Sequence, residues 1–138
     1  MSVSTQSSES LLSLPENAVG YLAILLAVVT GVIHLLLGPR VMGFSQTLGI
    51  LFILNGLGFI GGIVVYLTRY WRRELFLVAA GYAIVTFLAF FFFGGFEGFV
   101  SPFFRNGQLN MMAVVAKGAE VLFAAVTAYL YRVSADRV

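Results

Sequence analysis

The sequence contains no cysteine. The chain therefore forms no disulfide bond, holds no thiolate-ligated iron–sulfur cluster and has no cysteine nucleophile. Its compartment stays open at this stage, because disulfides are the usual sign of an oxidising environment and their absence fits either kind.

Charged side chains are scarce as well. They make up 10% of the 138 residues, against 60% hydrophobic residues, and the mean hydropathy is +0.98. A soluble domain carries about a quarter charged and about half apolar residues, so this composition indicates a chain that is solvated mainly by lipid. The net charge is only +2, and the arginines stand at the ends of apolar runs rather than in a basic stripe. That distribution excludes a nucleic-acid-binding surface.

Four long apolar runs separate the few charges. The predicted spans cover residues 18–37, 47–68, 74–93 and 111–131. A helix of about 20 residues at 1.5 Å per residue matches a hydrocarbon core of about 30 Å. The runs lack the polar stripe that each helix of a soluble bundle turns toward water. We therefore expect an all-α fold, with one four-helix transmembrane bundle over residues 18–131.

Short polar segments flank this predicted domain. Residues 1–17 are rich in serine, and no lysine or arginine precedes Arg40. A secretory signal needs a basic segment before its apolar run, so we expect the first run to be retained behind a flexible N-terminal tail. Residues 132–138 are expected to form a short C-terminal tail.

The arginines predict an orientation in the membrane. Four spans place both termini and the second connection on one side, and the first and third connections on the other. The first side carries Arg69, Arg72, Arg73, Arg132 and Arg137, whereas the second carries Arg40 and Arg105. The positive-inside rule therefore predicts a multi-pass protein of the cell membrane with both termini, and so both tails, in the cytoplasm.

The second span carries a GxxxG pair at Gly58 and Gly62. Small residues at this spacing let two helix backbones approach closely inside lipid. We expect this face to pack on another helix, which belongs either to the same chain or to a second copy.

The third connection, residues 94–110, is the only long one. It mixes glycine and proline with several phenylalanines, so we expect it to lie at the outer membrane interface. It is either a lid over the outer mouth of the bundle or a hydrophobic connector that rests on the headgroups.

Three ionisable side chains fall within the spans: His34, Lys117 and Glu120. Such groups cost about 2.5 to 3.5 kcal/mol each at a helix centre, so they usually face the bundle interior and have a partner. Counting 1.5 Å per residue places them and Asn55 roughly 5 to 14 Å below the outer boundary. The sequence therefore predicts an intramembrane polar cluster of His34, Asn55, Lys117 and Glu120 in the outer half. Further polar side chains expected near this level are Thr30, Tyr82 and Thr86.

A structural interpretation of the same residues stays open. Lys117 and Glu120 lie three residues apart on one helical face, where their charges can neutralise each other. Lys117 would then extend toward the outer interface, and His34 would bond a backbone carbonyl. Asn55 would make a hydrogen bond between helices.

The residue types limit the chemistry that these spans can perform. Zinc needs three or four ligands, and one histidine with one glutamate falls short. A bis-histidine haem would need a second histidine, and the sequence has no nucleophile elbow or hydrolytic triad. We therefore expect no catalytic residue, no metal and no cofactor, and a protein that is not an enzyme.

Two functions remain. The first is a non-enzymatic accessory or structural membrane component, whose polar cluster orders the bundle. The second is a small transporter, or a binder of an ion or small ligand, that uses the polar cluster. Its expected partners are the lipid bilayer and either a second copy of the chain or a larger membrane complex, with no nucleic acid.

Several stretches resemble small, uncharacterised four-span membrane proteins of haloarchaea. They read GVIHLLLGPR, LGILFILNGLGFIGG, VAAGYAIVTFL and KGAEVLFAAVTAYLY, and they cover most of residues 18–131. The matching marks are His34, Asn55 with Gly56, and the pair Lys117 and Glu120. The resemblance implies a four-helix fold in an archaeal cell membrane, and it carries no activity with it.

Overall fold

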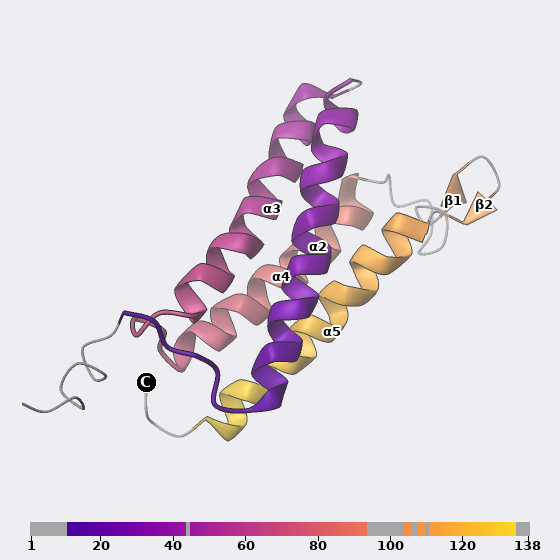
Figure 1. Ribbon diagram of the computed structural model, residues 1–138. Coiled ribbons are helices and arrows are strands. Elements are labelled where there is room, and N and C mark those ends of the chain that lie inside the picture. The colour runs from indigo at the N-terminus through magenta and orange to yellow at the C-terminus, as the bar shows by residue number, and fades with distance from the viewer. Residues whose placement is uncertain (1–10, 44, 94–103, 106–107, 110, 135–138) are drawn as a thin grey trace, which may run out of the picture.

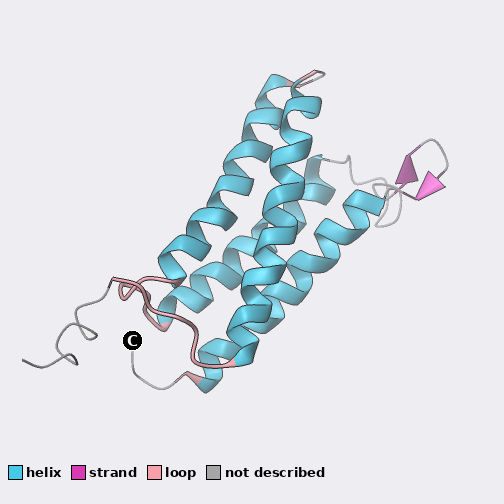
Figure 2. Cartoon of the chain, in the orientation of Figure 1, coloured by secondary structure: helices cyan, strands magenta, loops and turns pink. Residues whose placement is uncertain are grey.

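A computed structural model describes residues 11–43, 45–93, 104–105, 108–109 and 111–134. Four helices make up almost all of this part of the chain: α2 (Ala18–Met42), α3 (Gln46–Tyr66), α4 (Glu74–Phe93) and α5 (Met111–Val133). Two-residue strands, β1 (Phe104–Arg105) and β2 (Gln108–Leu109), pair antiparallel between α4 and α5 (Figures 1 and 2). The predicted all-α class is therefore confirmed.

Successive helices run in opposite directions, as Figure 1 shows. The described ends of the chain and the α3–α4 connection lie at one end of the bundle, which we call the terminal end. The α2–α3 connection lies at the opposite end. His34, Asn55 and Lys117 all stand on helix segments nearer that opposite end.

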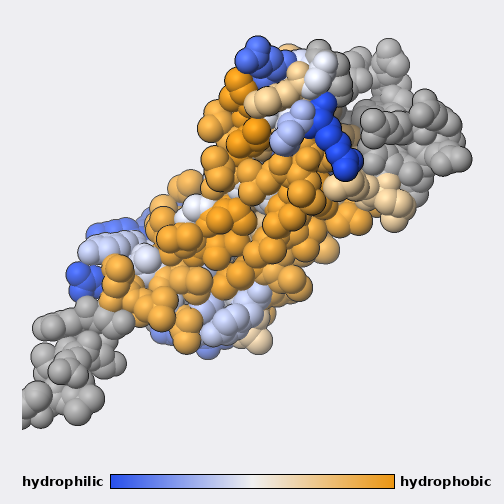
Figure 3. Space-filling model, turned by 45° about the horizontal axis from the view of Figure 1, so that its top comes forward, coloured by the Kyte–Doolittle hydropathy of each residue, from blue (hydrophilic) through white to orange (hydrophobic). Residues whose placement is uncertain are grey.

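The surface of the bundle is apolar along most of its length. Large hydrophobic side chains are exposed on all four helices, and Figure 3 shows a broad hydrophobic region between hydrophilic patches near the two ends. Helices α2, α3 and α5 are long and apolar enough to cross a membrane. Helix α4 is apolar over the shorter stretch Glu74–Phe90.

The helices do not all pack on one another. Helix α3 packs along α2, α2 packs on α5, and α5 packs on α4, whereas the backbones of α3 and α4 hardly approach each other in the described residues. Two cavities lie in the resulting cleft, because residues of both α3 and α4 line each of them. We call this space the α3–α4 cleft.

Close packing of α2 on α3 depends on glycines that recur every seven residues. A Cβ atom on Gly49 would lie 2.8 Å from the carbonyl oxygen of Gly38, and one on Gly56 would lie 2.7 Å from that of Gly31. Seven residues are about two helical turns, so each pair presents one face to the other helix. The backbones can approach this closely only because none of these positions has a side chain.

The predicted GxxxG face has a different role. A Cβ on Gly58 would collide with Tyr82 of α4, whereas one on Gly62 would meet no atom within 4 Å. Gly58 therefore packs within the chain, but Gly58 and Gly62 do not form the tight contact between helices. Gly58 lies two residues beyond Gly56 and so faces away from α2.

Helix α2 extends beyond its predicted end at residue 37. The predicted span ends directly before Gly38, Pro39 and Arg40, and this end is wrong because the helix continues through Pro39 to Met42. Proline removes one backbone donor, but Gly38 is buried against Gly49 and Ile53 of α3. Contact with α3 thus stabilises the additional helical turn that follows residue 37.

The structured part of the chain begins before Ala18. The backbone N–H of Ser13 donates to the oxygen of Leu67 at 2.7 Å, and that of Arg69 donates to the oxygen of Leu11 at 2.8 Å. The boundary that places residues 1–17 in a tail is therefore wrong, because residues 11–13 pair with the α3–α4 connection. Residues 1–10, and most of the loop predicted at 94–110, lie outside the described residues.

Asn17 marks the start of α2. Its side-chain oxygen accepts hydrogen bonds from the backbone N–H groups of Val19 and Gly20, at 2.7 and 3.3 Å. An asparagine in this position satisfies donors that the first helical turn leaves without partners.

Aromatic side chains close the α3–α4 cleft at the terminal end. The rings of Tyr66, Trp71 and Phe76 pack edge to face, with centroids 5.0 to 5.6 Å apart. Beside them, Arg73 lies 3.9 Å from the centroid of the Tyr131 ring and donates to the Tyr131 backbone oxygen at 2.9 Å. These contacts join the α3–α4 connection to the last turn of α5.

Substitution of Gly56, which is buried against α2, should distinguish the contribution of helix packing to stability from that of helix propensity. Gly56→Ala places a Cβ against the backbone of α2 and should lower the free energy of unfolding by about 1 to 3 kcal/mol. Gly61→Ala on the same helix meets no atom within 4 Å and should change it by less than about 1 kcal/mol, toward higher stability. Unfolding of both variants in mixed micelles measures the difference. Equal stability of the two would contradict the α2–α3 contact.

Candidate functional site

Glu120 of α5 is completely buried, with 0% exposed surface. Its Oε1 atom lies 2.7 Å from the Nζ atom of Lys117, which is itself only 5% exposed. The two residues are three positions apart, so the helix places them on one face. Their opposite charges form an ion pair at this distance. The Oε1 atom has no hydrogen-bond partner among the described residues.

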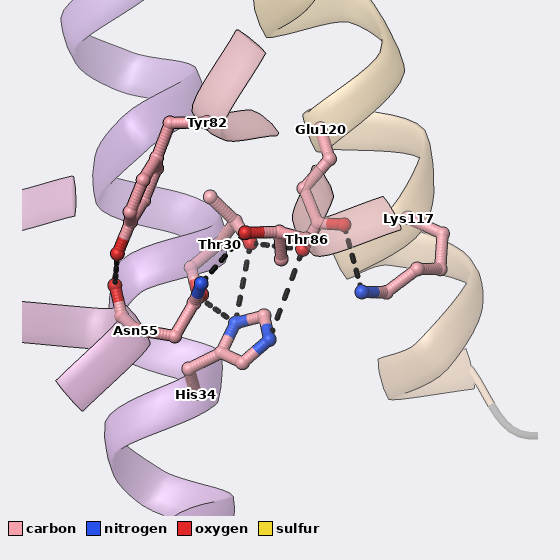
Figure 4. Close-up of polar contacts among 7 residues, drawn as sticks. All are labelled: Thr30, His34, Asn55, Tyr82, Thr86, Lys117 and Glu120. Carbon is pink, nitrogen blue, oxygen red and sulfur yellow. Dashed lines mark hydrogen bonds and ion pairs between the residues drawn. The ribbon is translucent and has the colours of Figure 1, made fainter. Parts of the chain in front are cut away.

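Thr30 of α2 connects this ion pair to a second helix. Its hydroxyl donates a hydrogen bond to Oε2 of Glu120 at 2.7 Å, and Thr30 is completely buried as well. Figure 4 shows the two side chains meeting between α2 and α5. A hydrogen bond to a buried carboxylate is stronger than one between neutral groups.

His34 stands one turn after Thr30, and its two ring nitrogens have different surroundings. Nδ1 lies 2.9 Å from the backbone oxygen of Thr30 and 3.3 Å from its hydroxyl oxygen. A carbonyl oxygen only accepts, so Nδ1 carries the proton. Nε2 lies 3.9 Å from Oε2 of Glu120, which is too far for a hydrogen bond.

The charges of this group add up to zero when the imidazole is neutral. Lys117 and Glu120 cancel each other, and a protonated His34 would add an uncompensated positive charge at a side chain that is only 6% exposed. Burial of an unpaired charge is costly. The Nε2 atom of His34 is therefore a hydrogen-bond acceptor. We call Thr30, His34, Lys117 and Glu120 the ionic cluster.

Asn55 of α3 belongs to a second group of polar contacts. Its Nδ2 atom donates to the hydroxyl oxygen of Thr86 at 2.6 Å, and the Tyr82 hydroxyl donates to the Asn55 backbone oxygen at 2.8 Å. These bonds cross the α3–α4 cleft, and we call the three residues the α3–α4 bridge. The Asn55 Oδ1 atom is buried and has no hydrogen-bond partner in the described part of the chain.

The structure thus places the four predicted site residues in two groups. His34, Lys117 and Glu120 contact one another directly or through Thr30, whereas Asn55 bonds to α4 and not to the ionic cluster. The sequence put Thr30 at the right level through its i, i+4 spacing from His34. No pattern in the sequence indicated the hydrogen bond from Thr30 to Glu120, because that contact depends on how α2 and α5 are rotated about their axes relative to each other.

The larger cavity of the α3–α4 cleft has a volume of about 420 Å³. His34, Asn55 and Lys117 form a polar part of its wall, together with Tyr82 and Thr86, and the rest of its lining is apolar. We call it the polar-walled cavity. Glu120 does not line it, because this side chain is enclosed behind Lys117 and Thr30.

A smaller cavity of about 250 Å³ lies in the same cleft toward the terminal end. Its lining includes Phe59 and Phe123, whose rings pack edge to face at 5.6 Å. Thr127 also lines this cavity, and its hydroxyl donates to the Phe123 backbone oxygen of the same helix at 2.8 Å. Tyr82 borders both cavities and lies between them.

The described residues do not bring together three histidine, aspartate or glutamate side chains of the kind that hold a metal ion. Lys117 approaches the Phe90 ring, with Nζ 5.0 Å from the centroid. The groups that a bound molecule could reach in the polar-walled cavity are the imidazole of His34, the ammonium of Lys117 and the side chain of Asn55.

Comparison with known proteins places the chain in a family. The model of a family of unknown function, DUF7475, matches residues 5–131. No curated protein and no solved structure matches the chain.

The ion pair can be tested by a double-mutant cycle. Glu120→Gln leaves the Lys117 ammonium buried without a counter-charge and should lower the free energy of unfolding by about 3 kcal/mol. The double variant Lys117→Met with Glu120→Gln removes both charges and should be more stable than Glu120→Gln alone. Unfolding in mixed micelles measures both. If Glu120→Gln is as stable as the wild type, the buried pair does not exist.

Proposed function

Because the chain belongs to DUF7475, a family of unknown function, we propose its role from the site alone. The protein is a multi-pass membrane protein that binds a small ligand in the polar-walled cavity and catalyses no reaction. The observation that carries this proposal is the convergence of His34, Asn55 and Lys117, from three different helices, on one cavity of about 420 Å³. Small-molecule sites are typically cavities of this size, mainly apolar, with a few polar groups that orient the ligand.

The arrangement of the polar groups supports binding rather than catalysis or transport. Glu120, the one carboxylate that the described residues place near the site, is enclosed by Lys117 and Thr30, so it is out of reach of a molecule in the cavity. Toward the terminal end the cleft continues as an apolar cavity. No chain of ionisable groups leads through it in the described residues, and such a chain would support passage of protons or ions.

An accessory or structural role is the second candidate. The observation that favours it is the complete burial of Glu120 and Thr30, whose hydrogen bond joins α5 to α2. In this role the ionic cluster would only fix the helix arrangement. Both roles require the ionic cluster, but only ligand binding requires that the polar-walled cavity be occupied.

For the membrane arrangement, we propose that all four helices span an archaeal cell membrane, with the terminal end in the cytoplasm. Arg69, Arg72 and Arg73 in the α3–α4 connection and Arg132 in the last turn of α5 support this orientation. The polar-walled cavity then lies in the outer half of the bilayer.

Orientation can be measured directly, because the chain has no native cysteine. A membrane-impermeant maleimide applied to intact cells should label Gln46→Cys, at the start of α3, and should not label Ser134→Cys, after α5. Both positions should react after the membrane is permeabilised. Labelling of Ser134→Cys in intact cells would reverse the proposed orientation.

Occupancy of the cavity can be tested by filling it. A photoreactive alkyl diazirine should attach saturably to α3 and α4 residues that line the polar-walled cavity, as mapped by mass spectrometry of the protein in vesicles. Ala89→Phe fills part of the cavity and should abolish this labelling, since Ala89 lines it. Ala125→Phe, on the exposed face of α5, is the matched control and should leave it unchanged. Equal labelling in both variants would favour the structural role.

A further inference from the structure

We propose that the ligand of the polar-walled cavity is a neutral amphiphile with a hydroxyl head, and that it enters from the bilayer between α3 and α4. This inference rests on the proposed ligand-binding function. It adds the chemical class of the ligand and its route of entry.

The charges around the cavity favour a ligand with a neutral head group. The ammonium of Lys117 already has its counter-charge at 2.7 Å on Glu120, so an anionic head would leave one negative charge uncompensated in an apolar surrounding. A cationic head would need access to Glu120, which has no exposed surface. Neither kind of ion is balanced in this cavity.

Among neutral head groups, the hydrogen-bonding side chains of the cavity favour a hydroxyl. His34 offers Nε2 as an acceptor, because its proton is on Nδ1 against the Thr30 backbone oxygen. Asn55 lines the same cavity, and its Oδ1 atom is an acceptor without a partner in the described residues. Lys117 supplies donors. A hydroxyl can both donate to such acceptors and accept from the ammonium, whereas an ether or a ketone can only accept.

The remaining wall of the cavity suits a hydrocarbon chain. Its apolar lining includes Leu51 and Phe52 of α3 and Val85, Ala89 and Phe90 of α4. Leu51 is 43% exposed and Val85 is 67% exposed, so the cavity reaches the outer surface of these two helices. The backbones of α3 and α4 hardly approach each other. In a bilayer this mouth faces acyl chains, and the hydrocarbon chain of the ligand would lie there.

The test compares three molecules that share a hydrocarbon chain and differ in the head: decan-1-ol, methyl decyl ether and decanoate. Each competes with the alkyl diazirine for labelling of the full-length protein in vesicles, at a pH where decanoate is ionised. Decan-1-ol should displace the label at a concentration about tenfold lower than the other two, because only its head satisfies the buried acceptors.

Two variants test which groups recognise the head. His34→Phe and Asn55→Leu each remove an acceptor at similar volume, and each should reduce the advantage of decan-1-ol over the ether severalfold while leaving displacement by the ether unchanged. Thr127→Val is the matched control, because it removes a buried hydroxyl that lines the smaller cavity and not the polar-walled cavity, and it should retain the preference. Thermal unfolding of each variant shows whether it is folded.

The outcomes separate this inference from the proposed function. If all three molecules displace the label equally, the cavity binds ligands but the assignment of a hydroxyl head is wrong. If decanoate is the strongest competitor, the site takes an anion and the charge argument fails. If the cavity is never labelled, the proposed ligand-binding function fails together with this inference. The comparison on the wild-type protein decides among these results without any variant.

Discussion

An ionised carboxylate without any exposed surface is stable only where an opposite charge and hydrogen-bond donors surround it. Glu120 is in this situation, with the ammonium of Lys117 at 2.7 Å and the hydroxyl of Thr30 at 2.7 Å. One partner comes from its own helix and the other from α2. Meeting both requirements fixes the rotation of α5 and its register against α2. It also places His34, one turn after Thr30, beside the same carboxylate.

The cleft follows from how the other helices are attached. Helix α3 is held against α2 by the glycine contacts, α2 packs on α5, and α5 packs on α4. The order of neighbouring helices in space is therefore α3, α2, α5, α4. Helices α3 and α4 are consecutive in sequence, and in the described residues they meet through aromatic contacts, including that of Phe59 with Tyr82, and through the α3–α4 bridge. The two cavities occupy the space that remains between them.

The number of helices and the level of the polar residues were predictable from the sequence. Apolar runs have the length of a span, and the spacing of Lys117 and Glu120 implies one helical face. Which helices would pack together was not predictable, because side chains that are apolar all around a helix do not indicate the face of contact. For this reason the sequence did not separate Asn55 from the ionic cluster. The continuation of α2 through Pro39 likewise depends on α3, a tertiary contact that local propensity does not contain.

The central claim is that Glu120 is an ionised carboxylate balanced by Lys117 inside the bundle. Infrared difference spectroscopy between the wild-type protein and Glu120→Gln, in lipid at neutral pH, observes this group directly. The wild type should have a carboxylate stretching band that disappears in the variant. A carbonyl stretching band of a protonated carboxylic acid in its place would contradict the buried ion pair, and with it the arrangement of the ionic cluster.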